Sequence, residues 1–192
     1  MAESIDEFMG RLMAMSKLTD DFSGLLRVVE AKEKSEPDDH MIKVLKGWIL
    51  QNMRRNDDAE RSFDEALSLN PRSAWASFRK GQLLFELGRD DEALACFGKA
   101  VKLKPLRADF WIEKALVEDR LGKISGSLDS YEKAIRLGDK SGWALAGKAR
   151  IQTYLNRFEE ALDTIRAAIK LEPQEEAFKA HEQVILDKMR GY

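Results

Sequence analysis

Cysteine and proline are scarce in this chain of 192 residues, which contains one of the first and four of the second. The single cysteine, Cys96, cannot form an internal disulfide, which fits a reducing, cytoplasmic compartment. No run approaches the roughly 18 uninterrupted apolar residues of a membrane span. The acidic start, Met1 to Glu7, is unlike a basic secretory leader. We therefore expect neither membrane insertion nor export.

A surplus of charge of one sign is also missing, because 32 Lys and Arg residues offset 34 Asp and Glu residues. The net charge of −2 gives no electrostatic reason to expect a nucleic acid or an anionic membrane as partner. Hydrophobic residues nevertheless make up 44% of the chain. This share excludes a disordered polymer and is enough to build a sizeable core.

The four prolines follow a period of 34 residues. They are Pro37, Pro71, Pro105 and Pro173, and the one vacant position of the series is Asp139. Because proline is excluded from helix interiors and biases the preceding residue away from helical geometry, this spacing indicates one turn made repeatedly. The chain is therefore expected to consist of internal repeats.

Small and large residues recur with the same period. The small positions are Gly47, Gly81, Ala115 and Ala149, then Ala59, Ala93, Ser127 and Ala161, then Ala66, Ala100, Ala134 and Ala168; the large ones are Phe63, Phe97, Tyr131 and Ile165. Small residues let two helices approach closely, and a large one fills the space beside the crossing. Gly88, Gly122 and Asn156 lie between the two halves of a unit and suit the left-handed conformation that ends many helices. Each unit is therefore interpreted as helix, turn, helix, turn.

This pattern resembles the tetratricopeptide repeat, in its period and in runs such as residues 88–105. The resemblance covers four repeats, 40–73, 74–107, 108–141 and 142–175. It implies an all-α fold, a right-handed α-solenoid of helix-turn-helix units. The departures are Asp139, Ser127 and a lysine in the seventh position of each repeat (Lys46, Lys80, Lys114 and Lys148), whose aliphatic stem we expect to cover the core.

The two ends of the chain are less regular. Residues 1–39 are expected to form a degenerate first repeat. Residues 176–192 keep the apolar pattern of a first helix and predict a capping helix, with Phe178, Ile185 and Met189 on its inner side. No linker divides the chain, so one continuous solenoid domain is expected.

A second face of each unit's first helix is unusually apolar. In tetratricopeptide arrays this face lines the concave groove, where ligands usually bind. The candidate groove residues are Met41, Val44, Trp48, Trp75, Phe78, Gln82, Phe85, Ile112, Leu116, Arg120, Trp143, Arg150 and Tyr154. We expect Trp75 and Phe78 to be accessible to solvent and Phe97 to be core. The surface predicts binding of an apolar or amphipathic segment, with Arg120 and Arg150 available for an acidic group.

Alternatives to a free groove remain open. The aromatic stripe can be core, or the groove can hold a second copy of the chain or the chain's own N-terminal segment. The first function hypothesis is an interaction scaffold or adaptor for a protein or peptide, and the other is a self-associating structural protein that forms a homo-oligomer.

Chaperone-binding tetratricopeptide domains hold a carboxylate with a Lys, Asn and Arg clamp. The inward positions here are Gly10, Ala14, Val44, Trp48, Phe78 and Gln82, which predict no such clamp.

Catalytic motifs are not found. The two histidines, His40 and His181, are too far apart in a solenoid to act together. No glycine-rich phosphate loop, paired-cysteine metal spacing or nucleophile motif occurs. Cys96, next to Phe97, is interpreted as a small packing residue. We expect no enzymatic activity, no metal and no cofactor.

Overall fold

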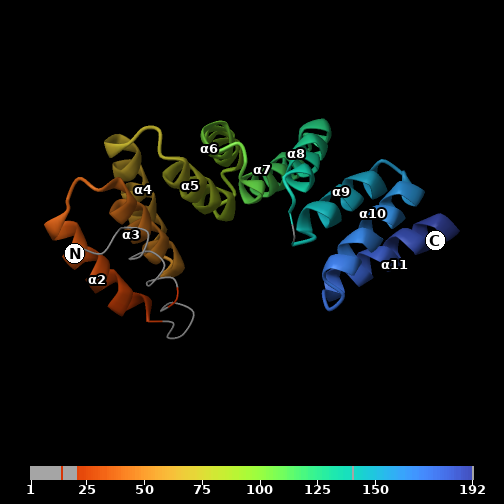
Figure 1. Ribbon diagram of the computed structural model, residues 1–192, viewed down its shortest axis with the longest axis horizontal. Coiled ribbons are helices and arrows are strands. Elements are labelled where there is room, and N and C mark those ends of the chain that lie inside the picture. Colours follow the sequence, from red (N-terminus) through yellow and green to blue (C-terminus); the bar gives the residue numbers. More distant parts are fainter. Residues whose placement is uncertain (1–13, 15–20, 140, 192) are drawn as a thin grey trace. The chain divides into compact units, whose positions relative to one another are not determined.

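The computed structural model describes Ala14 and residues 21–139 and 141–191. Within these residues every regular element is an α-helix, which confirms the all-α class (Figure 1). The chain divides after Leu103 into two compact units. The first part of the expected degenerate repeat, Gly10 included, lies outside the described residues.

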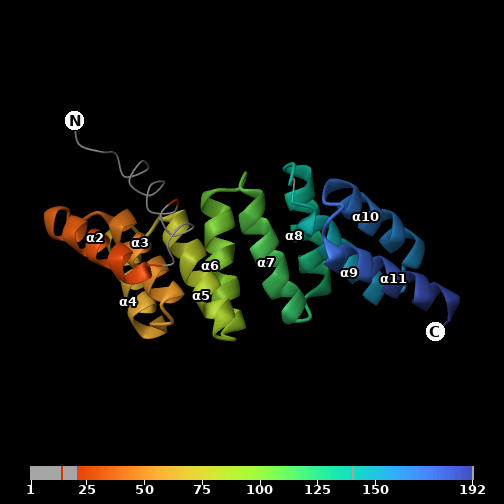
Figure 2. The ribbon, with the colours of Figure 1, turned by 90° about the horizontal axis from the view of Figure 1, so that it is seen from below.

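The described part of the first unit contains five helices. They are α2 (Phe22–Ser35), α3 (His40–Asn52), α4 (Asn56–Leu69), α5 (Ala74–Glu86) and α6 (Asp90–Leu103). Helices α3 and α4 pack along each other as one hairpin, and α5 and α6 as the next (Figure 2). Helix α2 packs against α3, and α4 packs against α5, so the layers of this unit follow the order of the chain.

The second unit repeats this arrangement. Its helices are α7 (Ala108–Arg120), α8 (Ile124–Arg136), α9 (Trp143–Tyr154), α10 (Phe158–Leu171) and α11 (Glu176–Arg190). The pairs α7–α8 and α9–α10 are hairpins, and α11 packs against α10 as a single helix. Helices α9, α10 and α11 lie side by side in both views of the ribbon (Figures 1 and 2).

Polar side chains start several of the first helices. The Asp39 carboxylate accepts a hydrogen bond from the Met41 amide at 2.7 Å, and the Ser73 hydroxyl accepts one from the Ala76 amide at 3.2 Å. Asp139, at the vacant proline position, accepts from the Ser141 amide at 3.1 Å and the Ala144 amide at 3.3 Å. These bonds satisfy amide groups that have no partner in the first turn of a helix. The missing proline is thus replaced by a residue that stabilises the start of α9.

The turn inside each hairpin requires a left-handed residue. Gly88, Gly122 and Asn156 have φ of 74°, 69° and 56°, which confirms the prediction for these positions. Arg54, at the equivalent position of the preceding hairpin, has φ of 60°. A side chain with a Cβ is disfavoured in this region, by roughly 1–2 kcal/mol. The repeat geometry therefore imposes a strained conformation on Arg54.

The lysines at the seventh position are half-buried and paired. Lys46 contacts Glu33 at 2.8 Å, Lys80 contacts Asp64 at 2.5 Å, and Lys148 contacts Glu132 at 3.0 Å. Lys114 contacts Glu118 at 2.6 Å. Each ammonium group therefore lies against a carboxylate.

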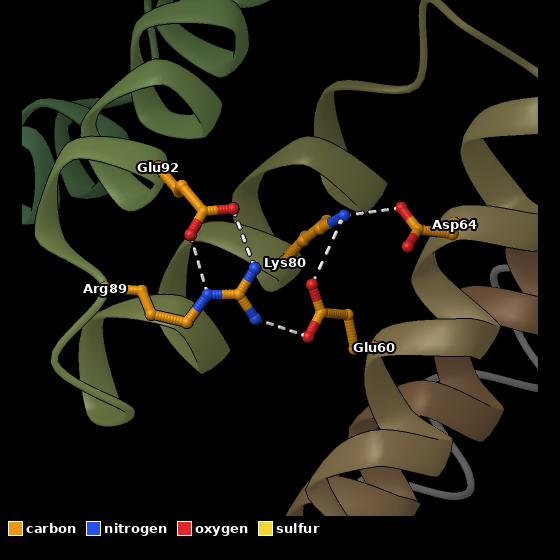
Figure 3. A network of polar contacts seen from close by, with 5 residues as sticks. All are labelled: Glu60, Asp64, Lys80, Arg89 and Glu92. Atoms are coloured by element: carbon orange, nitrogen blue, oxygen red, sulfur yellow. Dashed lines mark hydrogen bonds and ion pairs between the residues drawn. The ribbon is translucent and has the colours of Figure 1, made fainter.

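In the first unit one of these lysines belongs to a larger network (Figure 3). Glu60 of α4 lies 3.6 Å from Lys80 of α5 and accepts from Arg89 at 2.6 Å. The Arg89 guanidinium also binds both carboxylate oxygens of Glu92 at 2.7 Å. The network links α4, α5 and the start of α6, and the carboxylates raise the pKa of Arg89.

The last helix buries an apolar side against its own unit. Phe178 and Ile185 are buried in a cluster with Ile165 and Ala168. Met189 was expected in the same contact, and this prediction is wrong, because Met189 is 41% exposed. Met189 belongs to the last turn of α11, which lies beyond this cluster.

Candidate functional site

The predicted groove residues of the first unit lie on α3 and α5 and are only partly accessible. Met41, Trp48, Trp75, Gln82 and Phe85 are half-buried, and Val44 is buried.

Phe78 was expected to be accessible to solvent, and this prediction is wrong because Phe78 is 4% exposed. The physical reason is aromatic packing. Its ring centroid lies 5.7 Å from that of Phe97 and 6.0 Å from that of Trp75, edge to face in both pairs. Phe78 is therefore part of the core that Phe97 anchors, and Trp75 covers it from the outside.

A small polar cavity of about 230 Å³ lies beside Trp48. It is lined by Trp48, Gln51, Asn52, Arg54, Arg79, Gln82 and Glu86. The Arg79 guanidinium lies 5.9 Å from the Trp48 ring centroid and donates to Gln82 Oε1 at 3.0 Å. Two of the predicted residues, Trp48 and Gln82, thus come together in a mainly polar environment.

The second unit contains a larger and mainly apolar cavity of about 350 Å³, here named the Trp143 cavity. Its lining residues come from α7, α8, α9 and α11: Ile112, Leu116, Tyr131, Trp143, Ala146, Gly147, Arg150, Ala177, Phe178 and His181. Four of the predicted groove residues, Ile112, Leu116, Trp143 and Arg150, are therefore brought together. The predicted residues Arg120 and Tyr154 are exposed and do not line this cavity.

Helical periodicity explains how α9 contributes to the Trp143 cavity. Trp143, Ala146, Gly147 and Arg150 follow the spacing of one helix face. Trp143 is 48% exposed, and its ring centroid lies 5.0 Å from that of Phe178, edge to face. One wall of the cavity is therefore an aromatic pair whose outer member remains open to solvent.

The polar end of the cavity is organised around Arg150. The Nη2 group of Arg150 donates to the Asp119 carboxylate and, at 3.4 Å, to the hydroxyl of Tyr131. Burial raises the pKa of Tyr131 to about 12, so its hydroxyl stays protonated at neutral pH. His181 Nε2 lies 3.3 Å from Thr153 Oγ1. Burial, and then the charge of Arg150, lower the pKa of His181, which keeps its imidazole neutral near pH 7.

Six lining residues were not among the predicted groove residues: Tyr131, Ala146, Gly147, Ala177, Phe178 and His181. Tyr131 and Phe178 were assigned to core positions, and both are buried, but both also line the cavity. His181 was treated as a lone histidine. The available signal was the register of α11, because Ala177, Phe178 and His181 occupy neighbouring positions on one side of a helix.

Other chemistry is little supported by the described residues. Across residues 21–139 and 141–191 no group of three or more His, Cys, Asp or Glu side chains could hold a metal ion. Burial raises the pKa of the Cys96 thiol, which disfavours the reactive thiolate. His40 Nε2 lies 3.2 Å from the Asn70 amide nitrogen, a contact between α3 and the end of α4. No helix in the described part of the chain is long and apolar enough to cross a membrane.

Two features define the class of protein: paired helices that recur with a period of 34 residues, and a cavity whose lining includes the predicted faces of α7 and α9. Tetratricopeptide-repeat profiles match residues 44–95, 91–142 and 144–175. The chain belongs to the tetratricopeptide-repeat family, whose helical solenoids are protein-interaction scaffolds. No curated protein sequence matched the chain.

Solved structures share this fold at low sequence identity. The protein MamA is 20% identical, with a TM-score of 0.75 over 92% of this chain and 99% of its own. YrrB, described as a tetratricopeptide protein with an unusual peptide-binding site, is 17% identical, with a TM-score of 0.73 over 84% of each chain. TTC0263 of Thermus thermophilus is 18% identical, with a TM-score of 0.71 over 92% of this chain and 96% of its own.

Proposed function

We propose that this protein is an adaptor that binds an apolar or amphipathic segment of a partner protein on the inner faces of its first helices. One observation carries the proposal: the Trp143 cavity combines a half-exposed tryptophan, aliphatic walls and one arginine. Large aromatic anchors surrounded by apolar contacts contribute most of the energy of many protein interfaces. The peptide-binding site described for YrrB, which has the same fold, is in keeping with this role.

The proposal assigns no catalytic step and no cofactor to the chain. It retains a continuous repeat array over residues 40–175 with residues 176–192 as its cap, and a cytoplasmic setting that suits a chain with one cysteine. Self-association is the competing function, because an exposed aromatic surface can equally bind a second copy.

A selection experiment tests the proposal. Random 12-residue peptides are displayed and enriched on the immobilised full chain, and the enriched peptides are then titrated against the wild type and Trp143→Ala. We expect enriched peptides rich in apolar residues whose affinity falls about 30-fold or more in the variant, the loss typical of a central aromatic. The mass in solution is measured in parallel. A monomer with no enriched peptide contradicts the adaptor function, and a dimer that Trp143→Ala dissociates favours self-association.

A further inference from the structure

We propose that the Trp143 cavity binds one bulky apolar side chain of a partner segment that also carries an Asp or Glu one to three residues away, and that Arg150 binds this carboxylate. The inference rests on the proposed adaptor function and specifies the sequence that the adaptor recognises.

The apolar part of the cavity suits a single large side chain. Ile112 and Leu116 of α7 form one wall, and Trp143 and Phe178 form the other. The volume of about 350 Å³ lies at the lower end of the range of roughly 300–1,000 Å³ found for ligand sites. The Tyr131 ring occupies the space that a side chain would need at Gly147, and both residues line the cavity. The cavity can therefore bury one aromatic or large aliphatic group.

The charge of the cavity lining determines which kind of residue is favoured next to the apolar anchor of the partner. No Asp or Glu is among the residues that line the cavity, and His181 is neutral near pH 7. Arg150 is then the one charged lining residue, and its side chain is 54% exposed. An anionic neighbour of the anchor is favoured there, and a cationic one is disfavoured.

The hydrogen bonds of Arg150 leave donors available. Both of its contacts, to Asp119 and to Tyr131, use Nη2. Within the described residues Nε and Nη1 of Arg150 have no partner. The guanidinium is thus held through Nη2 and keeps the N–H groups of Nε and Nη1 available. These two groups do not point the same way, so a partner carboxylate accepts a single charge-assisted hydrogen bond from one of them.

Helix geometry sets the distance between the anchor and the acid. Arg150 follows Ala146 and Gly147 by about one helical turn, or roughly 5 Å, and follows Trp143 by about two turns, or roughly 10 Å. An extended peptide advances about 3.4 Å per residue. A carboxylate that reaches Arg150 therefore belongs to a residue one to three positions from the anchor.

The peptides enriched on the full chain test this inference through their sequences. We expect a Phe, Trp, Leu or Ile with an Asp or Glu within three positions. For one such peptide, replacing the acid by its amide should weaken binding about three- to fivefold, the effect of a partly exposed ion pair. The same replacement should have no effect on Arg150→Gln. Arg136→Gln serves as the matched control, because Arg136 is an exposed arginine of α8 outside the cavity.

A second pair of variants changes the charge at the edge of the cavity through an exposed residue. Ala177 is exposed in the first turn of α11 and lines the cavity. Ala177→Glu should weaken binding of the acidic peptide, and Ala177→Lys should preserve or strengthen this binding. Two outcomes overturn this inference and leave the adaptor function standing. The enriched peptides can be apolar and lack an acid, or removal of the acid can weaken binding to Arg150→Gln as much as binding to the wild type. A chain that enriches no peptide overturns both. A dimer dissociated by Trp143→Ala identifies a second copy as the occupant and also overturns the inference.

Discussion

The ring of Phe63 occupies the space that a side chain would need at Gly47. A Cβ built on Gly47 would lie 2.5 Å from Cε1 of Phe63, and one built on Gly81 would lie 2.9 Å from Cε1 of Phe97. Since real Cβ atoms do not approach another carbon so closely, Gly47→Ala must displace the ring or the helix. We expect the free energy of unfolding to fall by about 1–3 kcal/mol, as for other overpacked cores. Urea unfolding of the variant measures it.

Gly98 provides the matched control for this prediction. It also lies inside a helix, α6, but a Cβ there would meet no atom within 4 Å. Gly98→Ala should therefore stabilise the protein by about 0.5–1 kcal/mol, because glycine disfavours a helix interior. Equal effects of the two variants would show that helix propensity, and not the contact with Phe63, dominates at Gly47.

Phe78 and Phe97 should respond alike to truncation, because each is buried and their rings are in contact. We expect Phe78→Ala and Phe97→Ala each to cost about 3–5 kcal/mol of stability. Leu106→Ala is the control, since Leu106 is 78% exposed and its truncation should change stability by at most about 0.5 kcal/mol. If Phe78→Ala matches Leu106→Ala in thermal unfolding, Phe78 belongs to the accessible surface after all.

The repeat and its turns could be predicted from the sequence, whereas the depth of burial could not. Proline spacing and the recurring small residues report local geometry, so they predicted the helical class and the left-handed positions at Gly88, Gly122 and Asn156. Periodicity assigns Phe78 to a face of α5, but its exposure depends on how closely Phe97 and Trp75 approach that face. Only tertiary packing determines this distance.

The Trp143 cavity illustrates the same limit at the candidate site. Ile112, Leu116, Trp143 and Arg150 could be selected in the sequence because each occupies the same face of its helix. Tyr131 and His181 could not, because they reach the cavity from a second helix and from the terminal helix. Their contribution depends on the convergence of several helices, which a pattern within one repeat does not describe.

Arg54 should tolerate replacement by glycine with a gain in stability. Its φ of 60° is equivalent to that of Gly88, where a Cβ would meet no atom within 4 Å. Arg54→Gly relieves the strain of a left-handed residue with a side chain, and we expect a gain of about 0.5–1 kcal/mol. Gly88→Ala, the reverse change in the next repeat, should cost about 1 kcal/mol. A loss of thermal stability in Arg54→Gly would contradict this explanation.

His181 should make the protein less stable at mildly acidic pH. Its pKa in the folded state lies below the ordinary value of 6.5, first because of burial and then because of the charge of Arg150. Below about pH 6.5 the unfolded chain therefore binds a proton that the folded chain does not, and stability falls as the pH drops through the folded pKa. Urea unfolding at pH 7.5 and 5.5 should show a smaller difference for His181→Gln than for the wild type.

His40→Gln is the control for this pH dependence, because it removes the other histidine of the chain and leaves His181 in place. We expect it to keep the difference between pH 7.5 and pH 5.5. An unchanged difference in His181→Gln would assign the acid sensitivity to carboxylates instead.

Helix α11 should stabilise the second unit through Ile185 and not through Met189. Ile185 is fully buried against Ile165 and Ala168, whereas Met189, one turn later, is 41% exposed. Ile185→Ala removes buried methyl groups and leaves a cavity, so we expect a loss of about 2–5 kcal/mol. Met189→Ala in the same helix should cost at most about 0.5 kcal/mol.

Deletion of residues 176–192 should then cause aggregation or a clear drop in the midpoint of thermal unfolding, since it exposes the apolar side of α10. A deletion variant as soluble and as stable as the full chain would show that α11 is not a cap.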